Sequence, residues 1–204
     1  MDIILASTSP YRRALLERLR LHFRCESPKI DEVRLPQEMP ECMAKRLALS
    51  KAESVATANP SALVIGSDQV AVVDGSILGK PGGFNQAAKQ LRDSSGRNAC
   101  FYTAVALVCV DRAFLRFHVE PYNVKFRLLT ETQIANYLAL EEPYDCAGSF
   151  KVEGLGIALF ESLNGNDPTS LEGLPLITLT KFLADAGVDI LGSQAPKLMP
   201  DVAI

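Results

Sequence analysis

The first twenty residues predict a strand, a short polar loop and a helix, and this unit constrains the fold more than any other stretch. Residues 3–6 form an apolar run with the length and character of a buried strand. Ser9 then lies where its side chain can accept a hydrogen bond from the free amides of a helix, and Pro10 suits the first helical position because it has no N–H. Leu15, Leu16 and Leu19 recur at helical spacing.

Two arginines, Arg12 and Arg13, occupy the first turn of that expected helix. The positive end of the helix dipole disfavours cations there, whereas the same amides and dipole attract anions. Arginines placed against the dipole indicate a negatively charged ligand, and phosphate is the usual one. The alternative is a solvated pair of arginines beside an ordinary N-cap, and the local pattern leaves both open.

The composition narrows the class of protein. A chain of 204 residues can bury a full core in one domain, and 48% apolar with 22% charged residues is ordinary for a globular protein. The net charge of −3 gives no electrostatic attraction to nucleic acid or to an anionic membrane. No apolar stretch approaches the ~18 residues of a membrane span, and the N-terminus does not resemble a signal peptide. We therefore expect a cytoplasmic protein without nucleic-acid or membrane partners.

The cysteines argue against two kinds of site. They are odd in number, widely spaced and without a C-x-x-C pair, namely Cys25, Cys42, Cys100, Cys109 and Cys146. A disulfide framework and a zinc site both need regular spacing or paired cysteines. A reducing compartment fits this usage.

Two charged residues interrupt apolar patterns. Lys51 lies on the apolar face of a helix expected over residues 40–58, so it either snorkels to the surface or extends its ammonium into a polar cleft. Asp68 interrupts the apolar run of residues 63–73, whose two halves we interpret as strands, before an Asp74-Gly75 hairpin. An acid there costs desolvation energy unless it is paired, binds a metal or faces a solvent-filled site, and we favour a functional role.

Four weaker candidates lie on loops. Asp31 and Glu32 are adjacent on a proline-containing loop, where one or both can turn into a cleft or stay solvated. Lys80 belongs to a glycine-rich loop that lacks P-loop spacing but can approach a phosphate. Glu153 precedes Gly154 in a stretch of small residues that suggests close backbone packing on a ligand.

The remaining periodicities predict a mixed sheet with flanking helices. We expect a helix over 85–93, a central strand over 98–110, and antiparallel strands over 114–120 and 122–128 with Val124, Phe126 and Leu128 inside. A capping box at Thr130 opens a helix to residue 140, a strand covers 157–160, and a last helix runs from 173–175 to 186. Residues 1–192 then form a single domain, and 193–204 a loose C-terminal tail.

Taken together, the landmarks of the chain resemble the Maf family of nucleoside triphosphate pyrophosphatases over residues 3–190. They run, in order, Ser7-Thr8-Ser9-Pro10-Tyr11-Arg12-Arg13, Asp31-Glu32, Lys51, Gly66-Ser67-Asp68-Gln69, Gly79-Lys80-Pro81, Cys146-Ala147-Gly148-Ser149-Phe150, Glu153-Gly154-Leu155-Gly156 and Gly173-Leu174-Pro175-Leu176. The resemblance implies a Maf/ITPase-like α/β fold, in which a mixed twisted sheet is flanked by helices in two lobes with a central cleft. Homodimers are common among such proteins.

Three departures from the common Maf pattern point to one branch of the family. Tyr11, Gln69 and Glu153 stand where that pattern has arginine, threonine and glutamine. The combination resembles the branch that hydrolyses 7-methyl-GTP rather than the dTTP/UTP branch, which remains the alternative within the family. It also suits a methylated guanine, because an aromatic ring can stack on the cationic base and a carboxylate can pair with its N–H edge.

The resemblance also implies roles for individual residues. Asp68 would be the base that activates water for attack at the α-phosphorus, releasing 7-methyl-GMP and pyrophosphate. Asp68 and Glu32 would bind Mg²⁺ or Mn²⁺, with Asp31 left open as the second acid. The phosphates would be held by Ser7, Arg12, Arg13, Lys51 and Lys80. A second class of function is a nucleotide-binding regulator of cell division and septum formation, which an intact set of Asp68, Lys51 and Lys80 disfavours.

Overall fold

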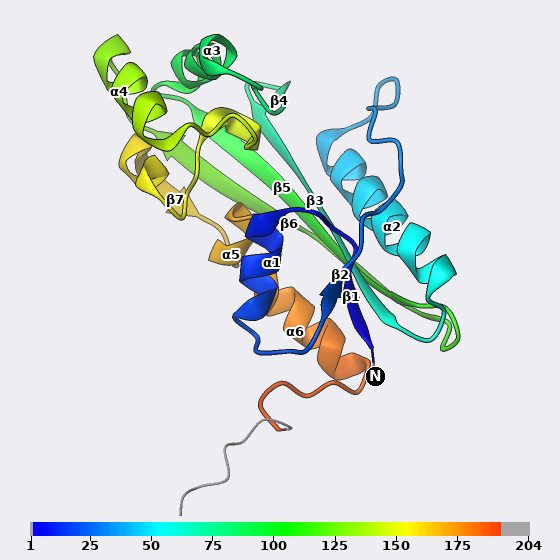
Figure 1. Ribbon diagram of the computed structural model, residues 1–204. Coiled ribbons are helices and arrows are strands. Elements are labelled where there is room, and N and C mark those ends of the chain that lie inside the picture. Colours follow the sequence, from blue (N-terminus) through cyan, green and yellow to red (C-terminus); the bar gives the residue numbers. More distant parts are fainter. Residues whose placement is uncertain (1, 193–204) are drawn as a thin grey trace, which may run out of the picture.

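The computed structural model describes residues 2–192 as a seven-stranded mixed sheet flanked by helices (Figure 1). The strands are β1 (Ile3–Leu5), β2 (Arg24–Cys25), β3 (Leu63–Val73), β4 (Ser76–Leu78), β5 (Asn98–Cys109), β6 (Phe114–Phe126) and β7 (Phe160–Asn164). The helices are α1 (Pro10–Glu17), α2 (Pro40–Ala58), α3 (Phe84–Ser94), α4 (Glu131–Glu141), α5 (Pro168–Leu171) and α6 (Leu176–Asp185), with 3₁₀ helices η1 (Ala147–Ser149) and η2 (Leu155–Leu159). The tail expected over 193–204 lies outside the described residues.

The strand order is β2-β1-β3-β5-β6-β7, and β4 pairs with β3. β1 is parallel to β2 and to the start of β3, while the β3–β5, β5–β6 and β6–β7 pairs are antiparallel. The mixed sheet that the sequence predicted is therefore confirmed.

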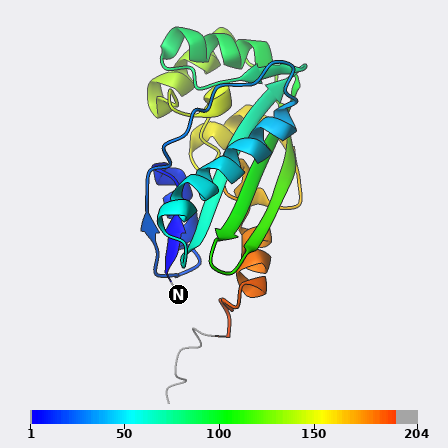
Figure 2. The same cartoon turned by 90° about the vertical axis from the view of Figure 1, so that its right-hand side faces the viewer.

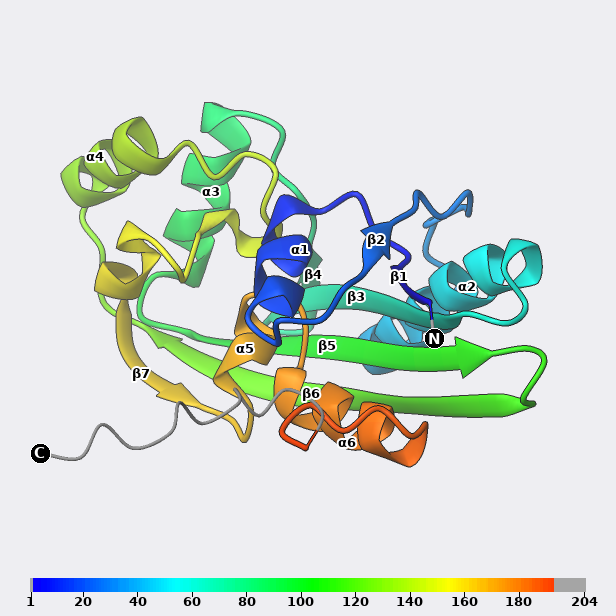
Figure 3. The same ribbon diagram turned by 60° about the horizontal axis from the view of Figure 1, so that its bottom comes forward.

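Helices cover both faces of the sheet. Ile3 and Leu5 of β1 pack with α1 and α6 on one face, whereas Ile4 packs with α2 on the other, as the alternation of a strand requires. Figures 2 and 3 show α2 lying along one side of β3 and β5, with α6 on the opposite side. A third apolar cluster joins the far ends of β3 and β5 to α3 and α4. None of the helices in residues 2–192 is long and apolar enough to cross a membrane.

Several local predictions are confirmed by the structure. The helix over residues 40–58 has those bounds, and Ser9 caps α1 by accepting from the Arg12 amide. Thr130 and Gln133 form a complete capping box. Asp74 and Gly75 both have positive φ, of 48° and 78°, as a tight hairpin turn requires.

Other local predictions are wrong. Residues 63–73 form one strand, and the two strands expected over 114–128 are a single strand, β6. Pro121 lies inside β6, beyond the residues that pair with β7, where a proline is tolerated at a sheet edge. Leu128 is 85% exposed because β6 ends at Phe126. The strand expected over 157–160 is mostly the 3₁₀ helix η2, and β7 follows it.

Helix α2 and strand β3 approach each other closely at Gly66. Gly66 of β3 lies directly under α2, and a Cβ atom on it would come within 2.2 Å of the Ala48 carbonyl oxygen. No side chain fits in that space. The glycine therefore lets the helix approach the strand closely, and Lys51 of α2 lies next to Asp68 of β3.

Candidate active site

The candidate site lies at a gap in the edge of the sheet. One edge of β3 pairs with β1 at Ile65 and with β4 from Ala71 onward. Between these two points, among the described residues, only β5 pairs with β3. Asp68 stands in the middle of this gap with Ala104 of β5 as its neighbour. A change of strand partner of this kind is where α/β proteins commonly place ligands.

Lys51 joins two carboxylates at the gap. Its Nζ lies 2.6 Å from Oδ1 of Asp68 and 2.9 Å from Oε1 of Glu32. The side chains of Lys51 and Asp68 are 6% and 9% exposed, whereas that of Glu32 is 58% exposed. The apolar helix face that carries Lys51 thus extends an ammonium into a polar cleft, one of the two outcomes that the sequence left open.

The cleft has a volume of about 500 Å³. Its walls come from the loop before α1, the loop after β2, helix α2, strand β3, the segment at β4 and two loops of the C-terminal half. Of the predicted site residues, the following line it: Ser7, Tyr11, Arg12, Glu32, Lys51, Asp68, Gln69, Lys80 and Glu153. One cavity therefore brings together nearly all the residues that the sequence analysis selected.

Arg13 and Asp31 are placed differently. Arg13 does not line the cleft; its guanidinium pairs with Glu17 at 3.0 Å, and its side chain is 65% exposed. Asp31 accepts a hydrogen bond from the Val33 amide at 3.0 Å and does not line the cleft. Of the two adjacent acids, the structure brings Glu32 to Lys51.

The start of α1 supplies donors to the cleft. Ser7 is buried, and its Oγ accepts from the Ser9 amide at 3.1 Å, so the hydroxyl proton remains available for a ligand. Arg12 is fixed by a hydrogen bond from its Nε to the Gly173 carbonyl, at 2.9 Å. Burial lowers the pKa of the Arg12 guanidinium, and the negative charges of Asp68 and Glu32 raise it in part. Arginine stays charged in any case.

A second group of polar residues lies in the cleft around Tyr11. The Tyr11 hydroxyl lies 3.3 Å from Oδ2 of Asp145, and the Cys146 thiol donates to Oδ1 of Asp145 at 3.4 Å. Burial raises the pKa of Tyr11 and raises that of Cys146 to about 12, so both groups stay protonated at neutral pH. Partial removal from water raises the pKa of Glu153, and the charges of Glu172 and Glu141 add to this. The cleft thus combines a cationic region with an aromatic and acidic one.

Gln69 is bound to the protein through its amide nitrogen. Nε2 donates to the carbonyl oxygens of Ser170 and Leu171 and to Oγ1 of Thr103. This holds α5 and the turn at Gly173 against the strand that carries Asp68. Ser67 helps, because its hydroxyl contacts the Gly173 carbonyl at 2.9 Å.

The sequence analysis assigned no role to Ser67, Gly173 or Asp145. Gly173 has a φ of +115°, which favours glycine and turns its carbonyl toward Arg12 and Ser67. A glycine two residues before a proline, as in Gly173-Leu174-Pro175, indicates a turn, and this was the available signal for Gly173. Asp145 carried no local signal, because its contact with Tyr11 spans 134 residues of chain.

The oxygen ligands of the cleft fit a hard divalent cation shared with a substrate. Within residues 2–192, no three His, Cys, Asp or Glu side chains are grouped to hold a metal by themselves. Mg²⁺, however, is usually bound by one or two carboxylates together with substrate phosphates and water. Asp68 and Glu32 are such a pair, joined through Lys51.

Comparison with known proteins gives a family and a fold. A model of the Maf family, described as "Maf-like protein", matches residues 2–186. A protein of Nitrosococcus oceani named 7-methyl-GTP pyrophosphatase is 54% identical over 93% of this chain and 95% of its own length. Proteins of the same name from Polaromonas sp. JS666 and Pseudomonas aeruginosa are each 52% identical, over 94% and 93% of this chain and 88% and 98% of their own lengths.

Two solved structures share the fold. A HAM1 protein from Coxiella burnetii superposes with a TM-score of 0.53 over 91% of this chain and 99% of that one. The Staphylococcus aureus Ham1 protein superposes with a TM-score of 0.51 over 91% of this chain and 100% of that one. Both are 14% identical to this chain, so the likeness is one of fold. The match over residues 2–186 and the relatives at about half identity lead to one conclusion: the chain belongs to the Maf family.

Proposed function

We propose that this protein is a nucleoside triphosphate pyrophosphatase that hydrolyses 7-methyl-GTP to 7-methyl-GMP and pyrophosphate. The observation that carries the proposal is the cleft in which Lys51 joins Asp68 and Glu32 beside Arg12 and Lys80. Cations beside paired carboxylates suit phosphoryl chemistry, which depends on positioning and on charge stabilisation. The relatives named 7-methyl-GTP pyrophosphatase support the choice of substrate.

Each of the two regions of the cleft binds a different part of the nucleotide. Arg12, Lys51 and Lys80 are the cations for the triphosphate, and Ser7 donates its hydroxyl proton to a phosphate oxygen. Tyr11 and Glu153 face the base, where a phenol ring stacks on a cationic purine and a carboxylate accepts from its N–H edge.

Asp68 is the residue that prepares water for attack. Its carboxylate is buried in the gap of the sheet and accepts a hydrogen bond from Lys51, which orients it. Asp68 and Glu32 would hold Mg²⁺ or Mn²⁺, which when bound neutralises phosphate charge and polarises the phosphorus. Lys51, which pairs with both acids, would bind the same phosphates.

The test measures pyrophosphate release from 7-methyl-GTP, GTP, dTTP, UTP and CTP with Mg²⁺ or Mn²⁺. We expect a preference for 7-methyl-GTP and a loss of about 10²–10⁴-fold in kcat on Asp68→Asn. A preference for pyrimidine nucleotides would overturn the assignment of Tyr11, Gln69 and Glu153. Tight binding without release from any nucleotide would replace the enzyme with a nucleotide-binding regulator.

A further inference from the structure

Glu32 lies on a stretch that forms no helix or strand. From Ser27 to Met39, between β2 and α2, the chain has only turns and irregular backbone. The Glu32 side chain is 58% exposed and pairs with Lys51 at 2.9 Å. Water weakens an ion pair that has one exposed partner, and ordering a loop costs conformational entropy. Another contact must hold this carboxylate at the cleft.

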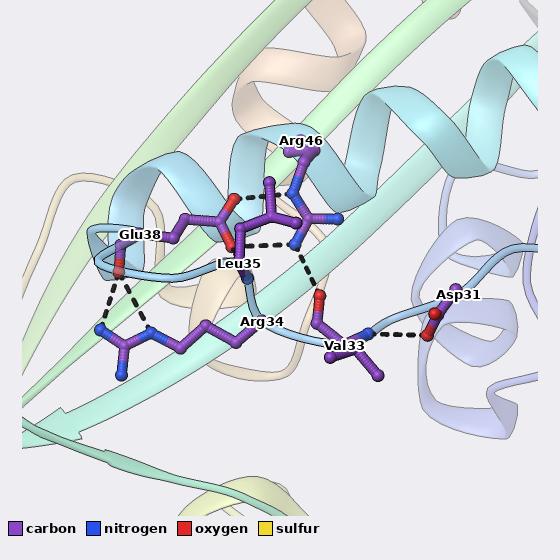
Figure 4. A network of polar contacts seen from close by, with 6 residues as sticks. All are labelled: Asp31, Val33, Arg34, Leu35, Glu38 and Arg46. Atoms are coloured by element: carbon purple, nitrogen blue, oxygen red, sulfur yellow. Dashed lines mark hydrogen bonds and ion pairs between the residues drawn. The ribbon is translucent and has the colours of Figure 1, made fainter.

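An arginine–glutamate pair provides that contact (Figure 4). Arg46 of α2 binds Glu38 with two hydrogen bonds, from Nε to Oε1 at 2.6 Å and from its terminal nitrogen to Oε2 at 2.9 Å. The Glu38 side chain is only 8% exposed and that of Arg46 is 28% exposed. A bidentate pair shielded from water is among the strong, geometrically defined interactions of proteins.

The same pair reaches the backbone next to Glu32. The terminal nitrogen of Arg46 also donates to the Val33 carbonyl at 3.1 Å, and Oε2 of Glu38 accepts from the Leu35 amide at 3.1 Å. Arg34 folds back and donates twice to the Glu38 carbonyl. Figure 4 shows Arg46 reaching from α2 to this loop, and the remaining contacts made within the loop. Arg46 and Lys51 belong to the same helix, so the backbone at residue 33 and the carboxylate at residue 32 are held by one rigid element.

We propose that Arg46 and Glu38 are positioning residues for the metal site, because they fix the loop that presents Glu32 to Lys51 and Asp68. The inference rests on the proposed function, in which Glu32 is a metal ligand. Residues that orient metal ligands typically change metal affinity by roughly 10–100-fold when they are replaced. Arg46 is therefore expected to act through Glu32.

The test measures Mn²⁺ binding without turnover, by electron paramagnetic resonance of free Mn²⁺, with and without pyrophosphate. Arg46→Ala and the milder Arg46→Lys should each weaken Mn²⁺ binding. The loss of affinity should be greater for Arg46→Ala, at about tenfold or more. Glu32→Gln should weaken it at least as much, and Arg46→Ala should add nothing further in the Glu32→Gln background. Arg92→Ala is the matched control, because Arg92 forms an equally bidentate pair with Glu131 outside the cleft.

Three results would overturn the inference. They are unchanged affinity in both Arg46 variants, an equal loss from Arg46→Ala with and without Glu32, and a wild type that binds no Mn²⁺ in either condition. Arg46→Lys covers the case in which Arg46→Ala does not fold, since it keeps the charge and the stem. Failure of the proposed function is read separately, from the nucleotide panel on the wild type, so the two outcomes are distinguishable.

Discussion

The hydroxyl of Tyr11 and the carboxylate of Asp145 meet in the cleft, although they are 134 residues apart in the chain. Tyr11 lies in the first turn of α1, and Asp145 lies in the loop that follows α4. The oxygen atoms are 3.3 and 3.4 Å apart, which is long for this kind of bond. The contact holds the ring at its hydroxyl end, in the wall of the cleft.

Two substitutions of Tyr11 separate the ring from its hydroxyl. Tyr11→Phe should keep most of the affinity for 7-methyl-GTP, whereas Tyr11→Ala should raise KM by roughly tenfold or more, since stacking on an aromatic ring contributes about 1–3 kcal/mol per base. Steady-state KM and kcat on 7-methyl-GTP and GTP provide the measurement. An equal loss of affinity for 7-methyl-GTP in Tyr11→Phe and Tyr11→Ala would show that the hydroxyl, rather than the ring, is responsible for binding.

The pair of Lys51 and Asp68 should stabilise the fold only while both members are present. Lys51→Met leaves the Asp68 carboxylate buried without its ammonium and should lower the free energy of unfolding by about 3 kcal/mol. The double variant Lys51→Met/Asp68→Leu should recover most of that loss and remain inactive. Urea unfolding, with pyrophosphate release measured in parallel, tests this. The prediction is contradicted if the double variant loses as much free energy of unfolding as the two single variants added together.

Sequence reasoning found Lys51 and Asp68 because each breaks an apolar pattern, and buried charge is rare without a purpose. It could not separate Arg12 from Arg13, because neighbours on a helix diverge by about 100° and the register relative to the cleft depends on packing. It missed Asp145, because the contact of Asp145 with Tyr11 joins a loop to a helix turn 134 residues away. It extended the alternation of β6 as far as Leu128 because periodicity alone does not show where pairing with β7 stops.

Glu153 should make binding of a cationic base depend on pH. Its pKa is raised above the ordinary value of 4.5, so as pH falls it gains a proton, and loses its charge, at a higher pH than an ordinary glutamate. KM for 7-methyl-GTP should therefore rise on acidification in the wild type, and less in Glu153→Gln. KM for GTP, which has the same N–H edge but lacks the ring charge, should rise less than KM for 7-methyl-GTP. If KM for 7-methyl-GTP rises on acidification by the same factor in Glu153→Gln as in the wild type, this carboxylate is not the cause.

Gly66 should tolerate no side chain. The Cβ of Gly66→Ala would lie 2.2 Å from the Ala48 carbonyl oxygen, so α2 must move away from β3 and carry Lys51 with it. Overpacking of this kind costs about 1–3 kcal/mol or more, and we expect lower activity as well as a lower free energy of unfolding. Gly79→Ala is the matched control, because its Cβ would meet nothing within 4 Å. Equal stability of the two variants would contradict the close approach.

Glu38 should give the fold a defined sensitivity to acid. The hydrogen bond from Arg46, followed by the Leu35 amide and the charges of Arg46 and Arg34, lowers the pKa of Glu38 from 4.5 to about 2 against a smaller effect of burial. Because the folded pKa is depressed, the contribution of Glu38 to stability is fully present above 4.5 and is lost as pH falls toward about 2. The difference in free energy of unfolding between wild type and Glu38→Gln should be constant near neutral pH and should shrink through that window. Glu131→Gln, which removes the exposed partner of Arg92, is the control for acid effects elsewhere on the surface. A difference that stays constant from neutral pH down to about 2 would show that Glu38 and Arg46 are not coupled as the geometry requires.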